Sequence, residues 1–188
     1  MKENSMNKEV SINKDVRLSP HFTLGELCKT SYHTLDGNIP SHVAIENLKR
    51  LCVWLEMLRE RYNELYGDVR PGHTGDRPPC DVGDITDGSV PIVSSDIPIV
   101  ISSGFRSEEV NMKCGGAKGS NHLTGCAVDI KCYGPEQMIR MAGILLDIAD
   151  GTKREFDELI QEKRGSTYWI HFAVRPKDNR RKILFDCK

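Results

Sequence analysis

The 188-residue sequence lacks an excess of either charge, since 26 lysines and arginines face 27 aspartates and glutamates. This balance argues against a protein held to nucleic acid or to a membrane surface by bulk electrostatics. No apolar run approaches the 18 or so residues of a membrane-spanning helix, so none is expected. The first twenty residues are polar and have no apolar signal-peptide core. We therefore expect synthesis in the cytoplasm without a signal peptide.

The sequence also lacks any CxxC pair, although it contains seven cysteines. An odd number of cysteines without paired spacing is typical of reduced thiols rather than of a disulfide framework. Cys114, Cys126 and Cys132 lie near one another in the chain, but their spacings match no common zinc motif. A metal site made of these thiols is therefore a minor alternative.

The length predicts one compact domain with a real core. We expect a flexible N-terminal arm over residues 1–18 and a single domain over residues 19–188. A stretch at about residues 67–95 is rich in Gly, Pro and Asp and has no helical period, which indicates a loop insertion. His73 and Cys80 lie in this loop, where such residues are more often exposed than metal-bound. No internal repeat is apparent.

Apolar periodicity and capping residues predict three main helices. Thr23 and Glu26 form a capping-box pattern that predicts a short helix over about Leu24–Lys29. Ser41 can cap a long amphipathic helix that ends near Tyr66 and Gly67. A third helix begins at Pro135 and runs to Asp150–Gly151.

Short β-branched runs predict the strands. They lie at Ile97–Ser103, Ala127–Cys132 and Tyr168–Val174, with a short helix after Ser107, a strand or helical turn at Phe156–Glu162, and another short element at Arg180–Phe185. This mixture predicts an α+β fold, in which a small, mainly antiparallel sheet is flanked by helices.

Two histidines and one aspartate form a candidate metal site. His122 and Asp129 lie seven residues apart in Ser120-x-His122-x-x-Gly125-x-Ala127-x-Asp129, and His171 follows in an aromatic strand. Two imidazoles and one carboxylate suit a catalytic zinc that keeps one coordination position for water. Each residue alone also has a structural explanation, as a turn cap, an acceptor for backbone amides or a core histidine. The combination favours the metal, because a charge at Asp129 between Val128 and Ile130 is costly without a partner.

These motifs resemble the M15 family of zinc D,D- and L,D-peptidases, most closely its small phage and bacterial branch with endolysins. The resemblance rests on Ser103–Ser107 (SGFRS), Asn111, Gly115-Gly116, the segment 120–129, Trp169-x-His171, His21–Leu27 and Asn47–Leu51. It covers residues 20–185, apart from the loop insertion, and implies the fold of hedgehog and D-Ala-D-Ala peptidases.

The resemblance implies that His122, Asp129 and His171 hold zinc. It also implies that Arg106 binds the substrate carbonyl or carboxylate and stabilises the developing oxyanion. Ser120 and Trp169 are the other expected substrate-binding residues. The alternative for Arg106 is a surface salt bridge with Glu108 or Glu109.

The general base is the point at which the sequence departs from the family pattern. Several members place an acid three residues before the last histidine, where this chain has Tyr168. The small phage-like branch has a Phe-Asp-x-Leu-Ile-x-Glu segment that matches Glu162, with Glu158 as the second choice. Solvated acids beside Lys163 and Arg164 are the structural alternative.

The expected function is a zinc metallopeptidase that hydrolyses peptidoglycan stem peptides at a bond involving a D-amino acid. It would act as a D,D-carboxypeptidase or an endolysin-type endopeptidase, with a water molecule activated by zinc as nucleophile. The alternative is a non-catalytic, metal-containing wall-binding or interaction module of the same fold, which Tyr168 favours. We expect a monomer whose partner is the wall peptide. It would reach the wall after phage-mediated release or act on recycled wall fragments in the cytosol.

Overall fold

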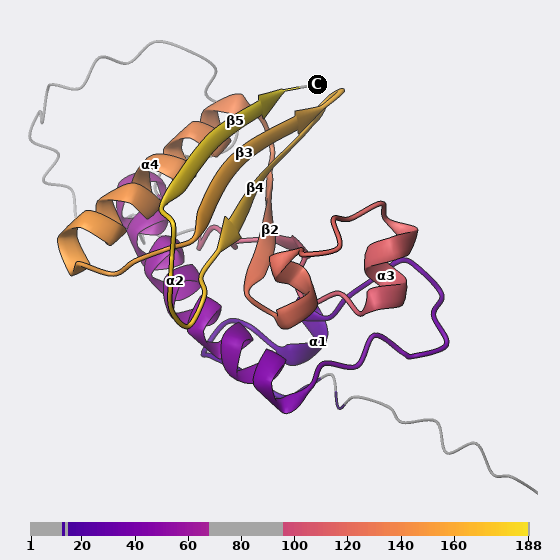
Figure 1. Cartoon of the computed structure of the whole chain (residues 1–188). Coiled ribbons are helices and arrows are strands. Elements are labelled where there is room, and N and C mark those ends of the chain that lie inside the picture. Colours follow the sequence, from indigo (N-terminus) through magenta and orange to yellow (C-terminus); the bar gives the residue numbers. More distant parts are fainter. Residues whose placement is uncertain (1–12, 14, 68–95, 188) are drawn as a thin grey trace, which may run out of the picture.

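The computed structural model describes residues 13, 15–67 and 96–187, and these form helices packed on a five-stranded sheet (Figure 1). The expected α+β class is confirmed. The insertion, with His73 and Cys80, and most of the N-terminal arm lie outside the described residues. At the end of that arm, Arg17 pairs with Thr23 in an antiparallel bridge and Leu18 packs on the core. None of the described helices has the length and apolarity needed to cross a membrane.

The sheet has the order β1-β2-β4-β3-β5. The strands are β1 (Ile101–Ser103), β2 (Ala127–Cys132), β3 (Glu158–Arg164), β4 (Thr167–Ala173) and β5 (Lys182–Cys187). All neighbours are antiparallel except β3 and β5, which run parallel. The sheet is therefore mainly antiparallel, as expected.

The helices are α1 (Leu24–Leu27), α2 (His42–Tyr66), α3 (Glu108–Lys113) and α4 (Pro135–Thr152), with a 3-10 turn η1 (Asn121–Thr124). Ser41 caps α2 as expected, because its side chain accepts from the Ala44 amide. The helices α2 and α4 lie together against one face of the sheet (Figure 1). Between them and the sheet, Trp54 of α2 packs edge-on against Phe156 and Phe172, with ring centroids 6.4 and 5.2 Å away.

Strand register separates the sheet into two faces. Asp129 of β2 and Ile160 of β3 both pair with His171 of β4, so these three side chains share one face. Their neighbours Val128 and Phe172 pair with each other on the opposite face, where α2 and α4 cover them. We call the first the site face and the second the helix face.

Several predicted elements differ in extent or are now assigned a type. The strand expected from Ile97 begins only at Ile101, because the Asn63 side chain bonds both the amide and the carbonyl of Ile97 at 2.7 and 3.0 Å. Pro98 also lacks the N–H that a strand would use. The helix expected to reach Lys29 ends at Leu27. The segment read as a strand or a helical turn is a strand, and the last short element is the parallel edge strand β5.

Candidate metal centre

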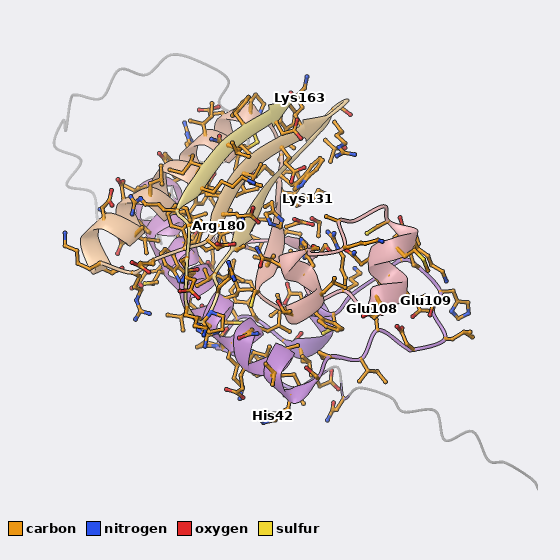
Figure 2. All side chains as sticks on the ribbon, in the orientation of Figure 1. His42, Glu108, Glu109, Lys131, Lys163 and Arg180 are labelled. Atoms are coloured by element: carbon orange, nitrogen blue, oxygen red, sulfur yellow. The ribbon has the colours of Figure 1, made fainter. Side chains whose placement is uncertain are left out.

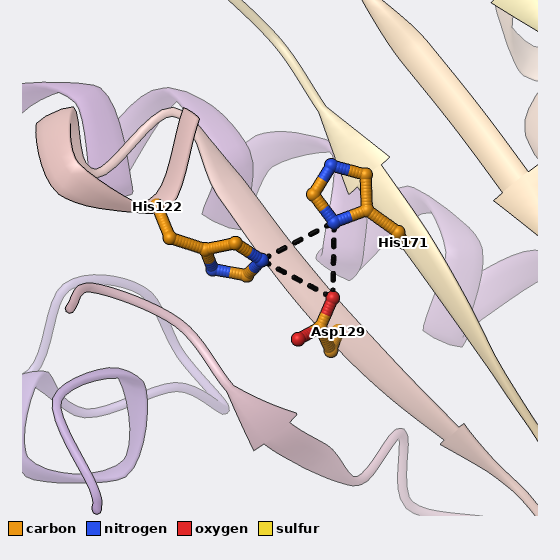
Figure 3. Close-up of side chains that lie close together, drawn as sticks. All are labelled: His122, Asp129 and His171. Atoms are coloured by element: carbon orange, nitrogen blue, oxygen red, sulfur yellow. Dashed lines mark hydrogen bonds and ion pairs between the residues drawn. The ribbon is translucent and has the colours of Figure 1, made fainter. Parts of the chain in front are cut away.

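Three ligand atoms converge above the site face (Figure 3). The Nε2 atom of His122 lies 3.2 Å from Oδ1 of Asp129 and 3.2 Å from Nδ1 of His171. Nδ1 of His171 lies 3.0 Å from the same Asp129 oxygen. Ligand atoms of a tetrahedral zinc site with bonds of about 2.0–2.1 Å are about 3.3 Å apart, so the trio fits such an ion with little movement.

His122 is placed by the tight turn η1. The Ser120 hydroxyl caps this turn by accepting from the His122 amide at 3.3 Å. Gly125 ends the turn with φ +70°, a left-handed conformation that favours glycine. A Cβ at Gly125 would lie 2.5 Å from the carbonyl oxygen of Ala44, so the turn also packs tightly on α2. Small residues at this point therefore let His122 and Asp129 converge.

The protein fixes which nitrogen of His122 faces the site. Nδ1 lies 2.6 Å from the carbonyl oxygen of Gly104, which can only accept a hydrogen bond. Nδ1 therefore carries the proton, and Nε2 keeps its lone pair for a metal. A Cβ at Gly104 would lie 2.2 Å from the Leu27 carbonyl oxygen, so the close contact between the backbones of Gly104 and Leu27 requires glycine at position 104.

The two carboxylate oxygens of Asp129 have different partners. Its Oδ1 faces the imidazoles, while its Oδ2 pairs with the guanidinium of Arg106. Burial opposes ionisation of this carboxyl group, but the adjacent His122 and His171 hold its pKa well below the usual range. The buried charge foreseen between Val128 and Ile130 therefore has three partners.

Arg106 is anchored beside the ligands. Its Nε donates to the Ser103 hydroxyl at 2.8 Å, and its backbone amide donates to the His122 carbonyl at 3.1 Å. The alternative pairing with Glu108 or Glu109 is not what the structure has. Both acids lie on α3 (Figure 2), and Glu109 pairs with Lys113.

His171 faces two carboxylates. Its Nδ1 points at Asp129, and its Nε2 lies 3.5 Å from Oε2 of Glu158. Burial lowers the pKa of the imidazole, but the two carboxylates outweigh this effect and raise it to about 9. The two carboxylates therefore favour the charged form of the imidazole.

The two candidate bases lie on the site face of β3 but differ in their surroundings. Glu158 pairs with His171, Arg180 and Lys182. Of these partners, His171 and Lys182 lower its pKa to about 2 against the effect of burial. Among the described residues, Glu162 has no ion-pair partner. Burial raises the pKa of Glu162, and the charge of Asp129 raises it further.

A cleft of about 790 Å³ opens beside the ligands. Ser120, Glu158, Glu162 and His171 are among the side chains that line it, together with several cations. Arg106 and Trp169 do not belong to its described lining. Trp169 lies across from Glu162 in the β3–β4 pair, and its side chain partly offsets the rise in the pKa of that carboxyl group.

Tyr168 lies away from the cleft. It pairs with Cys132 and packs against the core on the helix face. Because side chains alternate along β4, the position three residues before His171 points away from the ligands. The two candidate acids that line the cleft come from β3 instead.

The sequence did not point to a buried acid that supports the site, Asp157. Its side chain is fully buried and accepts from Arg180 at 2.6 and 2.8 Å and from Asn121 at 2.9 Å. Asn121 adjoins His122, and Arg180 lies in the segment that leads into β5 (Figure 2). Through these hydrogen bonds Asp157 connects η1 to the edge of the sheet. Asp157 stands at the Asp of the Phe-Asp-x-Leu-Ile-x-Glu segment, and that match was the available signal.

Comparison with known proteins supports the motif-based assignment. Residues 93–157 match the family model described as Peptidase M15. A search of curated proteins found no match. The matched segment contains Arg106, His122 and Asp129, whereas Glu162 and His171 lie beyond it and complete the site through the sheet. The match agrees with the family resemblance drawn from the motifs, and over residues 93–157 the chain is similar to Peptidase M15.

Proposed function

We propose that this protein is a zinc peptidase that hydrolyses peptidoglycan stem peptides at a bond involving a D-amino acid. The observation that carries the proposal is the convergence of two imidazole nitrogens and one carboxylate oxygen within 3.2 Å of one another beside an open cleft. Such a set binds zinc and keeps a coordination position for water.

Zinc held by His122, Asp129 and His171 would lower the pKa of a water molecule toward neutrality and polarise the scissile carbonyl. Glu162 is the proposed general base, which takes the proton of the water and passes it to the leaving amine. Its raised pKa and its lack of a recorded ion pair suit a group that must gain and lose a proton.

Glu158 suits the role of base less well. Its charge is balanced by Arg180 and Lys182, and its pKa of about 2 makes it a poor proton acceptor near neutral pH. In the proposed mechanism Arg106 acts through Asp129, whose outer oxygen it holds. Direct contact of Arg106 or Trp169 with the substrate stays an expectation from the family resemblance.

The cleft offers contacts for a peptide that carries carboxylates. Ser120 presents a hydroxyl, and Lys118 and Lys177 place two ammonium groups along the same lining. These cations would attract the free carboxylates of a stem peptide. We further propose a monomer that acts on the cell wall, reached after phage-mediated release, or on wall fragments in the cytosol.

The test is hydrolysis of defined wall peptides. Purified protein is stripped with a chelator, reloaded with zinc, and incubated with peptides ending in D-Ala-D-Ala and with cross-linked wall fragments. We expect activity to vanish on chelation and to return with zinc, but not in His122→Ala. Release of terminal D-alanine would indicate a carboxypeptidase, and cleavage of cross-links an endopeptidase. Zinc-loaded protein that is inert on every wall peptide would contradict the proposal, and wall binding without turnover would favour the non-catalytic module.

A further inference from the structure

The two histidines of the site present different nitrogens to the metal position. His122 presents Nε2, because the Gly104 carbonyl takes its Nδ1 proton at 2.6 Å. His171 presents Nδ1, which lies beside Asp129 and His122. An imidazole that binds a metal through Nδ1 carries its proton on Nε2, and that proton needs an acceptor if the ring is to be held in place.

Glu158 is the group that faces this nitrogen. Its Oε2 lies 3.5 Å from Nε2 of His171, and its side chain is only 14% exposed. It sits on β3 two residues from Ile160, which pairs directly with His171 in the sheet. The strand register therefore brings the Glu158 carboxylate to the side of the imidazole opposite the metal position.

Three donors fix the Glu158 carboxylate. Asn121 donates to Oε2 at 3.0 Å, while Arg180 and Lys182 approach Oε1 at 3.0 and 3.1 Å. A glutamate held in this way lines the cleft but is not free to exchange protons as a base would, because its charge and both of its oxygens are engaged. The same Asn121 amide group reaches Asp157, so the support of Glu158 is continuous with the turn that carries His122.

We propose that Glu158 is a positioning residue, which accepts the Nε2 proton of His171 and thereby presents Nδ1 to the metal. The inference rests on the proposed zinc function and deepens it, since it gives the two acids of β3 different tasks. Glu162 exchanges protons with the reactants, whereas Glu158 orients a ligand. Carboxylates that support a metal-bound histidine in this way raise metal affinity about 10–100-fold.

The test compares Glu158→Ala, which removes the acceptor, with Glu158→Gln, which keeps a neutral one. Glu155→Ala is the control, because Glu155 is exposed and lies outside the site. Zinc affinity is measured by competition with a chelator. We expect Glu158→Ala to bind zinc about 10–100-fold more weakly, Glu158→Gln to fall between it and the parent protein, and the control to match the parent.

The ring nitrogens of His171 are then followed by ¹H–¹⁵N NMR in the zinc-loaded protein. We expect a protonated Nε2 whose proton exchanges slowly with water, and exchange that is much faster in Glu158→Ala. Coordination through Nε2, or a zinc affinity of Glu158→Ala within twofold of the parent, would overturn the inference. Zinc binding that depends on Glu158 in a protein inert on every wall peptide would uphold it and remove only the proposed reaction.

Discussion

The helix face and the site face of the sheet differ most in how their side chains are stabilised. On the helix face, Val128, Ile170 and Phe172 are fully buried against α2 and α4, and their stabilisation comes from burial of apolar surface. On the site face, Asp129 and His171 are also withdrawn from water, but ion pairs and hydrogen bonds satisfy them. Adjacent residues of one strand thus serve stability and chemistry separately.

This separation means that neighbouring substitutions should have different consequences. A change on the helix face should alter the free energy of unfolding and leave the ligand geometry of the folded molecules intact. A change on the site face should alter metal binding or turnover, with a smaller effect on unfolding. Substitutions on each face can test whether the two faces act independently.

The largest expected effect on stability is on the helix face. Phe172 is fully buried and contacts both Trp54 and Phe156, so Phe172→Ala should cost about 3–5 kcal/mol of the free energy of unfolding. Urea titration of the metal-free protein measures this cost. Phe185→Ala is the matched control, because Phe185 is 61% exposed on β5 and its loss should change stability by about 0.5 kcal/mol or less.

Zinc affinity in the folded Phe172→Ala variant should stay close to that of the parent protein. A large loss of affinity would show that the helix face positions His171, the next residue along β4. In that case the two faces would not be independent, and packing against α2 would belong to the metal site.

On the site face, Glu162→Gln should lower kcat by about 10²–10⁴-fold, the usual range for loss of a general base. Zinc content and unfolding should change little, because Glu162 is neither a ligand nor a recorded ion-pair partner in the described chain. Glu155→Gln, on an exposed residue, is the control. A fall of less than about fivefold in kcat would remove Glu162 from the role of base.

The pH dependence of the parent enzyme sharpens this test. A base works in its ionised form, and burial raises the pKa of Glu162 above its ordinary value of 4.5. The rate should therefore decline as the pH falls through a pKa above that value, and this acid limb should be absent from the residual activity of Glu162→Gln. Profiles of kcat/KM measured from acid to neutral pH would show the limb.

The sequence predicted that His122, Asp129 and His171 would come together because local rules constrain their positions. His122 and Asp129 are separated by small residues that a tight turn requires, and His171 alternates with apolar neighbours in a strand. The main helices were predictable from capping and periodicity, and their observed bounds differ from the predicted ones by at most two residues at either end.

Roles that depend on partners distant in the sequence could not be predicted. Glu158 and Glu162 share one face of β3, and they are distinguished by the partners of Glu158, which include Arg180 and Lys182. Those cations come from the segment before β5 and from β5 itself, whose parallel pairing with β3 has no local signature. Asp157 was missed for the same reason, since Asn121 lies 36 residues away in the chain.

Asp157 lies just before β3, and its side chain is fully buried although it is charged. It therefore combines the burial typical of the helix face with the ion pairs typical of the site face. Burial opposes its ionisation, but Arg180 and Asn121 hold its pKa below the ordinary value of 3.8. A depressed pKa contributes stability above the ordinary value, and that contribution is lost as the pH falls through the folded-state pKa. Asp157→Asn should therefore cost about 2 kcal/mol at pH 7, measured by urea unfolding, and clearly less near pH 3.

The matched control for Asp157→Asn is Asp150→Asn. Asp150 pairs with Arg181 at 2.6 Å, but its side chain is 68% exposed, so its loss should cost well under about 1 kcal/mol at either pH. An equal cost of Asp157→Asn at both pH values would mean that shape rather than charge stabilises this position. If instead the cost depends on pH and zinc affinity falls as well, the buried Asp157–Arg180 pair stabilises the fold and the metal site together, through Asn121 and Glu158.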